Sequence, residues 1–424
     1  MATEAIEAPE ASAMRGLVER WREDTPGCTQ RIHLNNAGAG LMPRPVADAI
    51  RDHIELESRI GGYEAAESMA GKIEETYAEL ARLIGCAPRN VAVVENATVG
   101  FSQALSAFDF RPGDRIVTSR SDYPSNQIMY ISLARRCGVE IVMADDLPPS
   151  EGGGIDPESV RGLLRDPRCR LVSLTWVPTN SGLVQPVQEV GAVCATAGVP
   201  FLVDACQAVG QLPVDVARLQ CDFLAATGRK FLRGPRGIGF LYVSDHALER
   251  GVYPLYLDMR AADWTGPDDF RLAGSARRFE NWEYPYALVL GLRAAARYAN
   301  QAGAAALERT RDLAAYLRGR LEEIPTLRLL DRHPHLCAII IATLANWPAL
   351  DLEQRLRDRG INVNTSYRRD GFLDLDPQRA AVALRISPHY YNTRQELDTL
   401  VAALGALADG AALPEIAAAP PASP

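Results

Sequence analysis

Lysine occurs at only two positions of the 424-residue chain, Lys72 and Lys230, although lysine and arginine together number 45. Arginine stays protonated in proteins, so it cannot offer the free amine that attacks a carbonyl. Lys72 lies in a polar pattern, Gly71 to Glu75, that is typical of the solvated face of a helix. Lys230 lies between the apolar run Cys221 to Ala226 and the glycine-rich segment Arg233 to Gly239. This position predicts a tight loop and makes Lys230 a candidate for Schiff-base chemistry.

A carboxylate follows an apolar run 26 residues before this lysine, where Phe201 to Val203 ends in Asp204. Ligands of open α/β sheets bind at the carboxyl edge of the strands. An Asp at that edge could pair with the pyridinium nitrogen of pyridoxal 5′-phosphate and keep the ring electron-withdrawing. Gln207 could reach the phenolic oxygen of the same ring. The alternative is that Asp204 caps the next helix.

Small polar residues mark a third position, where the apolar run Val91 to Val94 leads into a helical pattern through Asn96, Ala97 and Thr98. Backbone N–H groups at the start of a helix bind phosphate. Taken alone, this junction predicts only an ordinary helix cap. Combined with Asp204 and Lys230, it indicates a site for pyridoxal 5′-phosphate.

The elements that must position these residues alternate along the chain. Seven short apolar runs, separated by helical patterns, are expected as strands: Asn90 to Glu95, Arg115 to Arg120, Glu140 to Ala144, Leu171 to Val177, Pro200 to Val203, Cys221 to Ala226 and Gly237 to Val243. This alternation predicts an α/β fold with a mostly parallel central sheet and helices on both faces.

The pattern changes after Trp282. Long helical patterns lead to a few later strands, which predict a smaller α+β domain; these segments are Tyr286 to Asn300, Ala304 to Glu323, Cys337 to Ala342, Leu350 to Arg359 and Ala381 to Ile386. We expect a large cofactor-binding domain over 15–290, with 15–45 packing on the small domain, and a small domain over 291–408. Residues 1–14 and 409–424 are expected to be tails without fixed structure.

Composition favours small-molecule chemistry. The net charge of −8 and the pI near 5.5 argue against a nucleic-acid-binding surface. No apolar run approaches the roughly 20 residues of a membrane span, and the first residues lack the features of a signal peptide, so a cytoplasmic location is expected. The eight cysteines are scattered, which predicts reduced thiols, and the six histidines show no zinc-ligand spacing, so no metal site is expected.

Five motifs together resemble the class V aminotransferase family of fold-type I enzymes that use pyridoxal 5′-phosphate. They are His33-Leu34-Asn35-Asn36-Ala37-Gly38, Asn96-Ala97-Thr98, Asp204-Ala205-Cys206-Gln207-Ala208, the stretch Thr227 to Phe240, and Arg385 to Asn392. The resemblance spans residues 30 to 405. Segments 225–234 and 276–283 look most like the branch of ergothioneine-pathway C–S lyases and isopenicillin N epimerase-like proteins.

The resemblance assigns the cofactor contacts. It makes Lys230 the residue of the internal aldimine, Asp204 the pyridinium partner and Gln207 the contact to O3′. Ala97, Thr98 and Thr227 would hold the phosphate, and Arg229 replaces a common histidine there. Tyr123 falls where many relatives stack a histidine on the ring, and a tyrosine can stack but cannot supply imidazole acid–base chemistry.

The resemblance also assigns the substrate pocket. Arg385 would bind the substrate carboxylate, since a planar guanidinium pairs with it through two hydrogen bonds. Asn36 and Thr179 would line the same pocket. The alternative for Arg385 is an ion pair on the surface.

The reaction is less narrowly defined. Cysteine desulfurases need a nucleophilic cysteine upstream of the carboxylate-binding arginine, and Gly360 to Leu384 contains none, which disfavours persulfide chemistry. We therefore expect a lyase that cleaves a C–S bond by β-elimination from a cysteine conjugate or its sulfoxide. The alternatives are an amino-acid racemase or epimerase, an aminotransferase, a decarboxylating or deaminating enzyme of secondary metabolism, and a non-catalytic binding protein on the same fold.

A homodimer with sites completed by the partner chain is expected as well. Asp263 to Tyr286 concentrates aromatic side chains among arginines and acids, a composition enriched at interfaces. The alternative is an internal linking loop whose aromatic side chains pack on the large domain.

Overall fold

A seven-stranded sheet forms the centre of the computed structural model, which describes residues 9–331, 333–367, 371, 373 and 382–411. The strand order is β2 (Val91–Val94), β8 (Gly239–Val243), β7 (Phe223–Thr227), β6 (Phe201–Asp204), β5 (Cys169–Thr175), β3 (Arg115–Thr118) and β4 (Glu140–Met143). Strand β8 alone runs in the direction opposite to the other six strands. All seven predicted strands and the mostly parallel sheet are confirmed.

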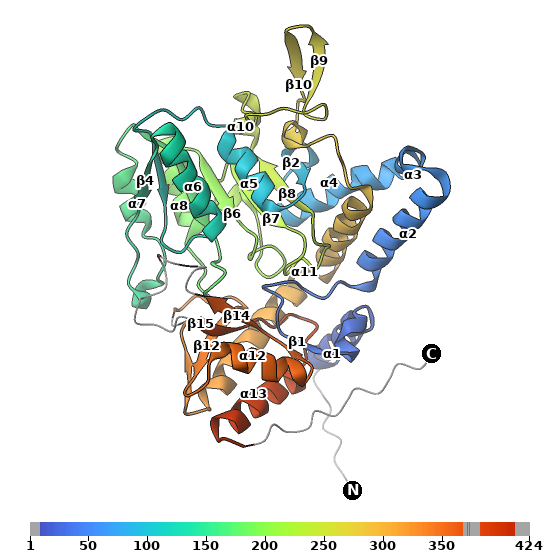
Figure 1. The fold of residues 1–424 in the computed structure, drawn as a ribbon, viewed down its shortest axis with the longest axis vertical. Coiled ribbons are helices and arrows are strands. Elements are labelled where there is room, and N and C mark those ends of the chain that lie inside the picture. Colours follow the sequence, from blue (N-terminus) through green and yellow to red (C-terminus); the bar gives the residue numbers. More distant parts are fainter. Residues whose placement is uncertain (1–8, 332, 368–370, 372, 374–381, 412–424) are drawn as a thin grey trace.

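Helices cover both faces of this sheet (Figure 1), and neighbouring residues of β5 and β6 pack on opposite faces. Leu171 and Leu202 join one core with α5 (Ala97–Ser106) and α6 (Pro124–Cys137). Val172 and Val203 join the other, which includes side chains of α4 (Ala70–Ile84), α7 (Pro157–Leu163) and α8 (Val187–Ala197). Strands buried on both faces are apolar throughout, and this explains why they could be recognised in the sequence.

A second, four-stranded antiparallel sheet forms the smaller domain, in the order β11 (Leu327–Leu329), β12 (Ile340–Leu344), β15 (Val382–Ile386) and β14 (Asn364–Tyr367). Its core includes side chains of α12 (Ala349–Asp358) and α13 (Arg394–Ala408). Strand β1 (Ile32–His33) pairs in parallel with β13 (Ile361–Asn362), so an N-terminal segment lies against the C-terminal part of the chain (Figure 1).

One long helix, α11 (Tyr286–Glu322), runs from the large domain into the small one. Its early side chains, such as Val289 and Ala296, belong to the large core, whereas Leu313 and Leu317 belong to the small core. Between them, Gly303 leaves helical geometry with φ 58° and ψ −154°. Ala314, beyond this break, still packs in the large core, so α11 contributes to both cores and the predicted boundary at residue 290 stays a prediction.

The predicted tails need a similar adjustment. Helix α1 begins at Pro9 and continues to Glu23, so residues 9–14 are helical rather than part of an unstructured tail. At the other end α13 stops at Ala408, and the predicted tail beyond residue 411 lies outside the described residues, as do residues 1–8. The remaining large-domain helices are α2 (Arg44–Ile60), α3 (Gly62–Ser68), α9 (Val216–Leu219) and α10 (Asp245–Glu249). Among the helices described, none is long and apolar enough to cross a bilayer.

Glu280 lies beside β2, at one edge of the central sheet, and its carboxyl group binds the backbone of that strand. It follows the 3₁₀ turn Ala276–Phe279 and is almost fully buried beside β2. Its Oε1 accepts hydrogen bonds from the backbone N–H of Val93, at 2.8 Å, and from the Tyr77 hydroxyl, at 2.8 Å. Burial raises the pKa of this carboxyl to about 7.

This pKa predicts a specific pH dependence of stability. Because the folded-state pKa lies above the unfolded value of 4.5, the stabilisation from the bound proton is complete below pH 4.5 and is lost as the pH rises through 7. Glu280→Gln keeps a hydrogen-bond acceptor but cannot ionise. We expect wild type to lose up to about 3 kcal/mol of unfolding free energy between pH 5 and pH 8 relative to this variant. Denaturant titrations at both pH values test this, and parallel pH profiles would contradict it.

Candidate active site

Lys230 lies in the loop between β7 and β8, at the carboxyl edge of the parallel strands. Its side chain is buried, and Nζ is 5.7 Å from the centroid of the Tyr123 ring. Within the part of the chain that the structure describes, the amine makes no hydrogen bond or ion pair. Burial is the main cause that lowers its pKa. A lowered pKa enlarges the fraction of neutral, nucleophilic amine.

Asp204 ends the neighbouring strand β6 and is also buried. Its Oδ1 accepts the backbone N–H of Cys206 at 2.9 Å, and its Oδ2 accepts Nδ2 of Asn126 at 3.1 Å. The next helix, α9, begins only at Val216 and is capped by Asp215. The alternative interpretation of Asp204 as a helix cap is therefore wrong, and its carboxylate is available at the sheet edge.

Gln207, Thr179 and Arg385 meet beside this edge. The Thr179 hydroxyl oxygen accepts hydrogen bonds from Nε2 of Gln207 at 3.3 Å and from Nη1 of Arg385 at 2.9 Å. Gln207 Oε1 is buried and has no hydrogen-bond partner among the described residues. Arg385 is only 7% exposed, so the alternative of a surface ion pair is wrong. The structure thus brings together three residues that are far apart in the sequence.

Asn36 lies close by, next to Ala37, whose carbonyl accepts a hydrogen bond from Gln207. Its Nδ2 donates to the carbonyl of Ser387 at 2.7 Å, and its Oδ1 accepts the Tyr391 hydroxyl at 2.5 Å. The side chain is fully buried. These contacts tie the N-terminal segment to the small domain, and the substrate contact of Asn36 stays a prediction.

Two of the residues predicted to bind phosphate, Ala97 and Thr98, lie where α5 begins. The N–H groups of Ala97 and Thr98 belong to the first turn, which has no intrahelical acceptor for them. Asn96 caps this turn by accepting the Val99 N–H at 3.0 Å. Gly239 packs so closely that a Cβ there would lie 3.2 Å from the Ala97 nitrogen, and Gly239 also pairs with Thr227. Ala97, Thr98 and Thr227 are therefore gathered around one small region.

Arg229 has a mixed role in this region. Its Nη1 donates to the carbonyl of Gly38, so part of the guanidinium anchors the N-terminal segment. Burial, assisted by the nearby Arg236, lowers its pKa. The predicted phosphate contact can use only the remaining N–H groups.

Two residues of this network were missed in the sequence. Asp122 is buried and accepts the Tyr123 backbone N–H at 2.7 Å, and Asn126 donates to both Asp122 and Asp204. The available signal was their spacing, since residues 122 and 126 flank the start of α6, where a strand end meets a helix. From this segment the resemblance assigns a role to Tyr123 only.

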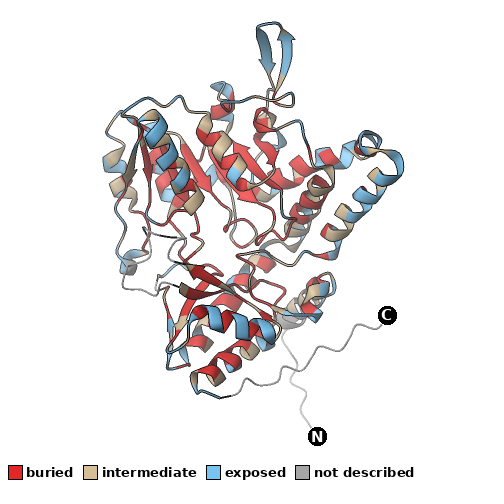
Figure 2. Ribbon diagram, in the orientation of Figure 1, coloured by how far each residue is buried: buried red, intermediate tan, exposed pale blue. Residues whose placement is uncertain are grey.

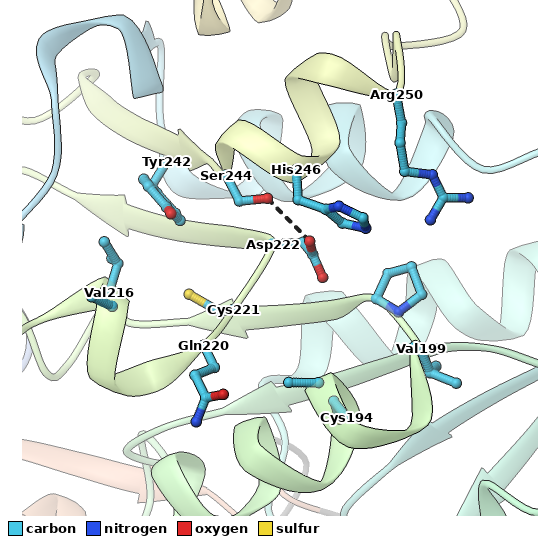
Figure 3. Close-up of a pocket in the computed structure, with 14 residues that line it drawn as sticks. Cys194, Val199, Val216, Gln220, Cys221, Asp222, Tyr242, Ser244, His246 and Arg250 are labelled. Carbon is cyan, nitrogen blue, oxygen red and sulfur yellow. Dashed lines mark hydrogen bonds between the residues drawn. The ribbon is translucent and has the colours of Figure 1, made fainter.

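A separate cavity of about 410 Å³ lies at the opposite edge of the sheet (Figure 3). It is lined by residues that precede β6 and β7, including Pro200 and Cys221, and by His246 and Arg250. Asp222, drawn at its centre, accepts a hydrogen bond from Ser244 at 3.0 Å. None of the predicted site residues lines this cavity, so it is separate from the site around Lys230.

Comparisons with known proteins agree with this geometry. The family profile described as aminotransferase class V matches residues 32–400. A cysteine desulfurase of Dickeya dadantii is 29% identical over 413 residues, covering 91% of this chain and 96% of the relative. A probable cysteine desulfurase of Methanothermobacter thermautotrophicus is 26% identical over 387 residues, covering 89% and 95%.

Solved structures show the same fold. A cysteine desulfurase of Thermococcus onnurineus superposes with a TM-score of 0.84 at 23% identity, covering 97% of this chain and all of that one. A cystine C–S lyase, C-DES, in complex with its product cysteine persulfide, gives a TM-score of 0.79 at 25% identity, covering 90% and 99%.

The profile match covers most of the chain, and the fold and the residues at the sheet edge agree with it. This chain therefore belongs to the class V aminotransferase family, whose cofactor is pyridoxal 5′-phosphate, as the sequence predicted.

Proposed function

We propose that the protein cleaves the C–S bond of a cysteine-derived amino acid, a cysteine conjugate or its sulfoxide, by β-elimination. The observation that carries this proposal is the buried amine of Lys230. It lies within electrostatic range of Asp204 and Arg385, and it has no hydrogen-bond partner among the described residues. A buried amine without a hydrogen bond is unfavourable unless another group completes the site.

The residues present fit pyridoxal 5′-phosphate. Lys230 would be its covalent attachment point, Asp204 would pair with the pyridinium nitrogen, and Gln207 would contact O3′ of the ring. Gln207 Oε1 is buried without a hydrogen-bond partner among the described residues, so a bound polar group would satisfy it. The first-turn N–H groups of Ala97 and Thr98, with Thr227 and Arg229, would hold the phosphate, and Tyr123 would stack on the ring. When bound, the cofactor supplies an electron sink for the bonds to Cα.

The chain's own residues supply the rest of the chemistry. Arg385, held by Thr179, would fix the substrate carboxylate. The neutral amine of Lys230 would take the Cα proton, while the C–S bond breaks and its electron pair leaves with sulfur. Sulfur then takes up a proton, and water converts the remaining three-carbon unit to pyruvate and ammonia. A thioether substrate yields a thiol, and a sulfoxide yields a sulfenic acid.

A desulfurase is the second candidate, because several relatives carry that name. That reaction transfers sulfur to a cysteine of the enzyme, which must be a thiolate. Gly360 to Leu384 contains no cysteine, and its residues 368–370, 372 and 374–381 lie outside the described part of the chain. Cys206 is close to Lys230, but burial raises the pKa of its thiol, which makes it a poor nucleophile. The lyase is therefore favoured.

Product analysis separates the candidate reactions. Holoenzyme incubated with cystine, S-substituted cysteines and their sulfoxides should give pyruvate and ammonia in equal amounts, together with a sulfur-containing product. Alanine with sulfide would support the desulfurase. A racemised substrate, or a keto acid that retains sulfur, would support a racemase or an aminotransferase and would contradict the lyase.

Lys230→Ala provides the matched control. It should abolish turnover and the visible absorption of the bound cofactor, because Lys72 is the only other lysine. Borohydride reduction of the wild type should place the cofactor adduct on the peptide that contains Lys230. An adduct on Lys72 would contradict the assignment.

Arg385→Lys tests the carboxylate site. An ammonium loses the two-pronged geometry of the guanidinium, so KM should rise about 10-fold or more. Arg309→Lys is the control, because Arg309 also donates to backbone carbonyls, those of Tyr390 and Asn392, outside the site. Steady-state kinetics of both variants decide the matter, and an equal KM for Arg385→Lys and wild type would move the carboxylate site elsewhere.

We further propose that the active form is a homodimer joined in part by the β9–β10 hairpin. This hairpin, β9 (Ala262–Gly266) and β10 (Asp269–Leu272), projects from the body (Figure 1) and is exposed (Figure 2). Trp264 is 83% exposed, whereas Phe279 of the same predicted segment is buried in the large domain. The internal-packing alternative therefore describes only part of this segment, and the exposed aromatic side chains are left for a partner.

Light scattering of dilute protein should report about twice the chain mass of 46.2 kDa. Trp264→Asp should shift the equilibrium toward the monomer, since a charge replaces an interfacial aromatic ring. Leu350→Asp, at an exposed apolar residue of α12 in the small domain, should leave the mass unchanged. A wild-type monomer with full activity would refute the shared site.

A further inference from the structure

We propose that Asn126 is a positioning residue that joins two buried carboxylates, Asp204 and Asp122, and thereby keeps Asp204 oriented toward the pyridinium nitrogen. This inference rests on the proposed function in one respect only, namely that Asp204 faces the cofactor ring. It assigns a role to a residue that makes no contact with the substrate.

The geometry of Asn126 is that of a strut. The side chain lies in the first turn of α6 and is 2% exposed. Its Nδ2 donates to Asp204 Oδ2 at 3.1 Å and to Asp122 Oδ1 at 3.1 Å. An amide nitrogen carries two hydrogens, so one group can satisfy both carboxylates at the same time.

Asp122 is the fixed end of this strut. Besides Asn126, it accepts hydrogen bonds from the Thr118 hydroxyl at 3.0 Å, from the Thr175 hydroxyl at 2.5 Å, from Gln127 at 3.2 Å and from the backbone N–H of Tyr123 at 2.7 Å. These donors come from β3, β5 and α6. A carboxylate held from three elements has little freedom to move, so it can hold Asn126 in place.

The amide of Asn126 donates to two carboxylates that lie close together, so it offsets their mutual repulsion. Two carboxylates that share one amide nitrogen repel each other, and the charge of Asp204 disfavours ionisation of Asp122. Burial, together with Asp204, raises the pKa of Asp122, while its hydrogen bonds act in the opposite direction. The other titratable groups around Asp204 are Lys230, Cys206 and Tyr130. Without the hydrogen bond from Asn126, protonation of Asp122 becomes more favourable.

The same strut links the two groups that would flank the ring. Asp122 receives the N–H of Tyr123, whose side chain would stack on the ring face, and Asn126 connects Asp122 to Asp204 at the ring nitrogen. Asp122 would therefore help to fix both residues that contact the ring, Tyr123 at its face and Asp204 at its nitrogen. Loss of the strut should change the electronics of the bound cofactor more than the affinity for substrate.

The test is Asn126→Leu, which keeps the approximate volume and removes the donor. We expect the pH midpoint of the visible band of the bound cofactor to rise by about one unit, because a pyridinium that is less well stabilised withdraws fewer electrons. The dissociation constant of the cofactor should rise about 10-fold. The turnover number should fall by about 10- to 100-fold, with KM within a factor of about two.

Gln127→Leu is the matched control, since Gln127 donates to Asp122 but not to Asp204. Its spectral midpoint should equal that of the wild type. If Asn126→Leu does not fold, as judged by thermal unfolding of the cofactor-free protein, Asn126→Ser retains a single hydroxyl donor and should give an intermediate midpoint. A wild-type midpoint in the folded position-126 variant, or an equal shift in Gln127→Leu, overturns the proposal. A wild-type protein that never shows the visible band refutes the proposed function instead.

Discussion

Hydrogen bonds of Arg233 and close backbone packing at Gly210 fix the loop that carries Lys230, and the rest of the site depends on these contacts. Arg233, three residues later, is fully buried in the left-handed region at φ 62°. Its guanidinium donates to the Leu41 carbonyl and to the hydroxyls of Thr25 and Tyr390, and it lies 4.4 Å from the centroid of the Tyr391 ring. Hydrogen bonds and aromatic faces compensate the buried charge. A long side chain thus fastens the lysine loop to both ends of the chain.

Close backbone packing completes this restraint and explains the reversed strand. A Cβ at Gly210 would lie 2.3 Å from the carbonyl carbon of Phe231, so no larger residue fits beside the lysine loop. Because β8 runs antiparallel to β7, the chain returns immediately after the loop and brings Gly239 against the start of α5. The amine and the phosphate-binding turn are therefore positioned by one hairpin-like unit rather than by two independent elements. Asp204 then lies on the adjacent strand, within the same sheet edge.

This dependence on distant contacts determines what could be predicted from the sequence. The strands were recognisable because burial on both faces makes them apolar throughout, and Lys230 stood out because arginine fills almost every other cationic position. Asp204 followed from its place at a strand end. By contrast, Arg233 was one arginine among many, and the bonds of Asn36 to Ser387 and Tyr391 join residues more than 300 positions apart. The partners of such polar side chains emerge only when the two ends of the chain are brought together.

The site also shows why family membership and reaction are separate questions. Holding the cofactor, withdrawing electrons from Cα and fixing a carboxylate are common requirements of every reaction considered for this chain. Desulfuration and elimination differ in the fate of the sulfur. In desulfuration a thiolate of the enzyme takes it up, whereas in elimination the sulfur leaves the substrate and takes up a proton. Cys206, the thiol beside Lys230, is kept protonated by its burial, and the strand β15 that presents Arg385 is preceded by a segment without cysteine. The lack of a cysteine between Gly360 and Leu384, rather than the presence of a particular binding residue, is thus the feature that favours elimination.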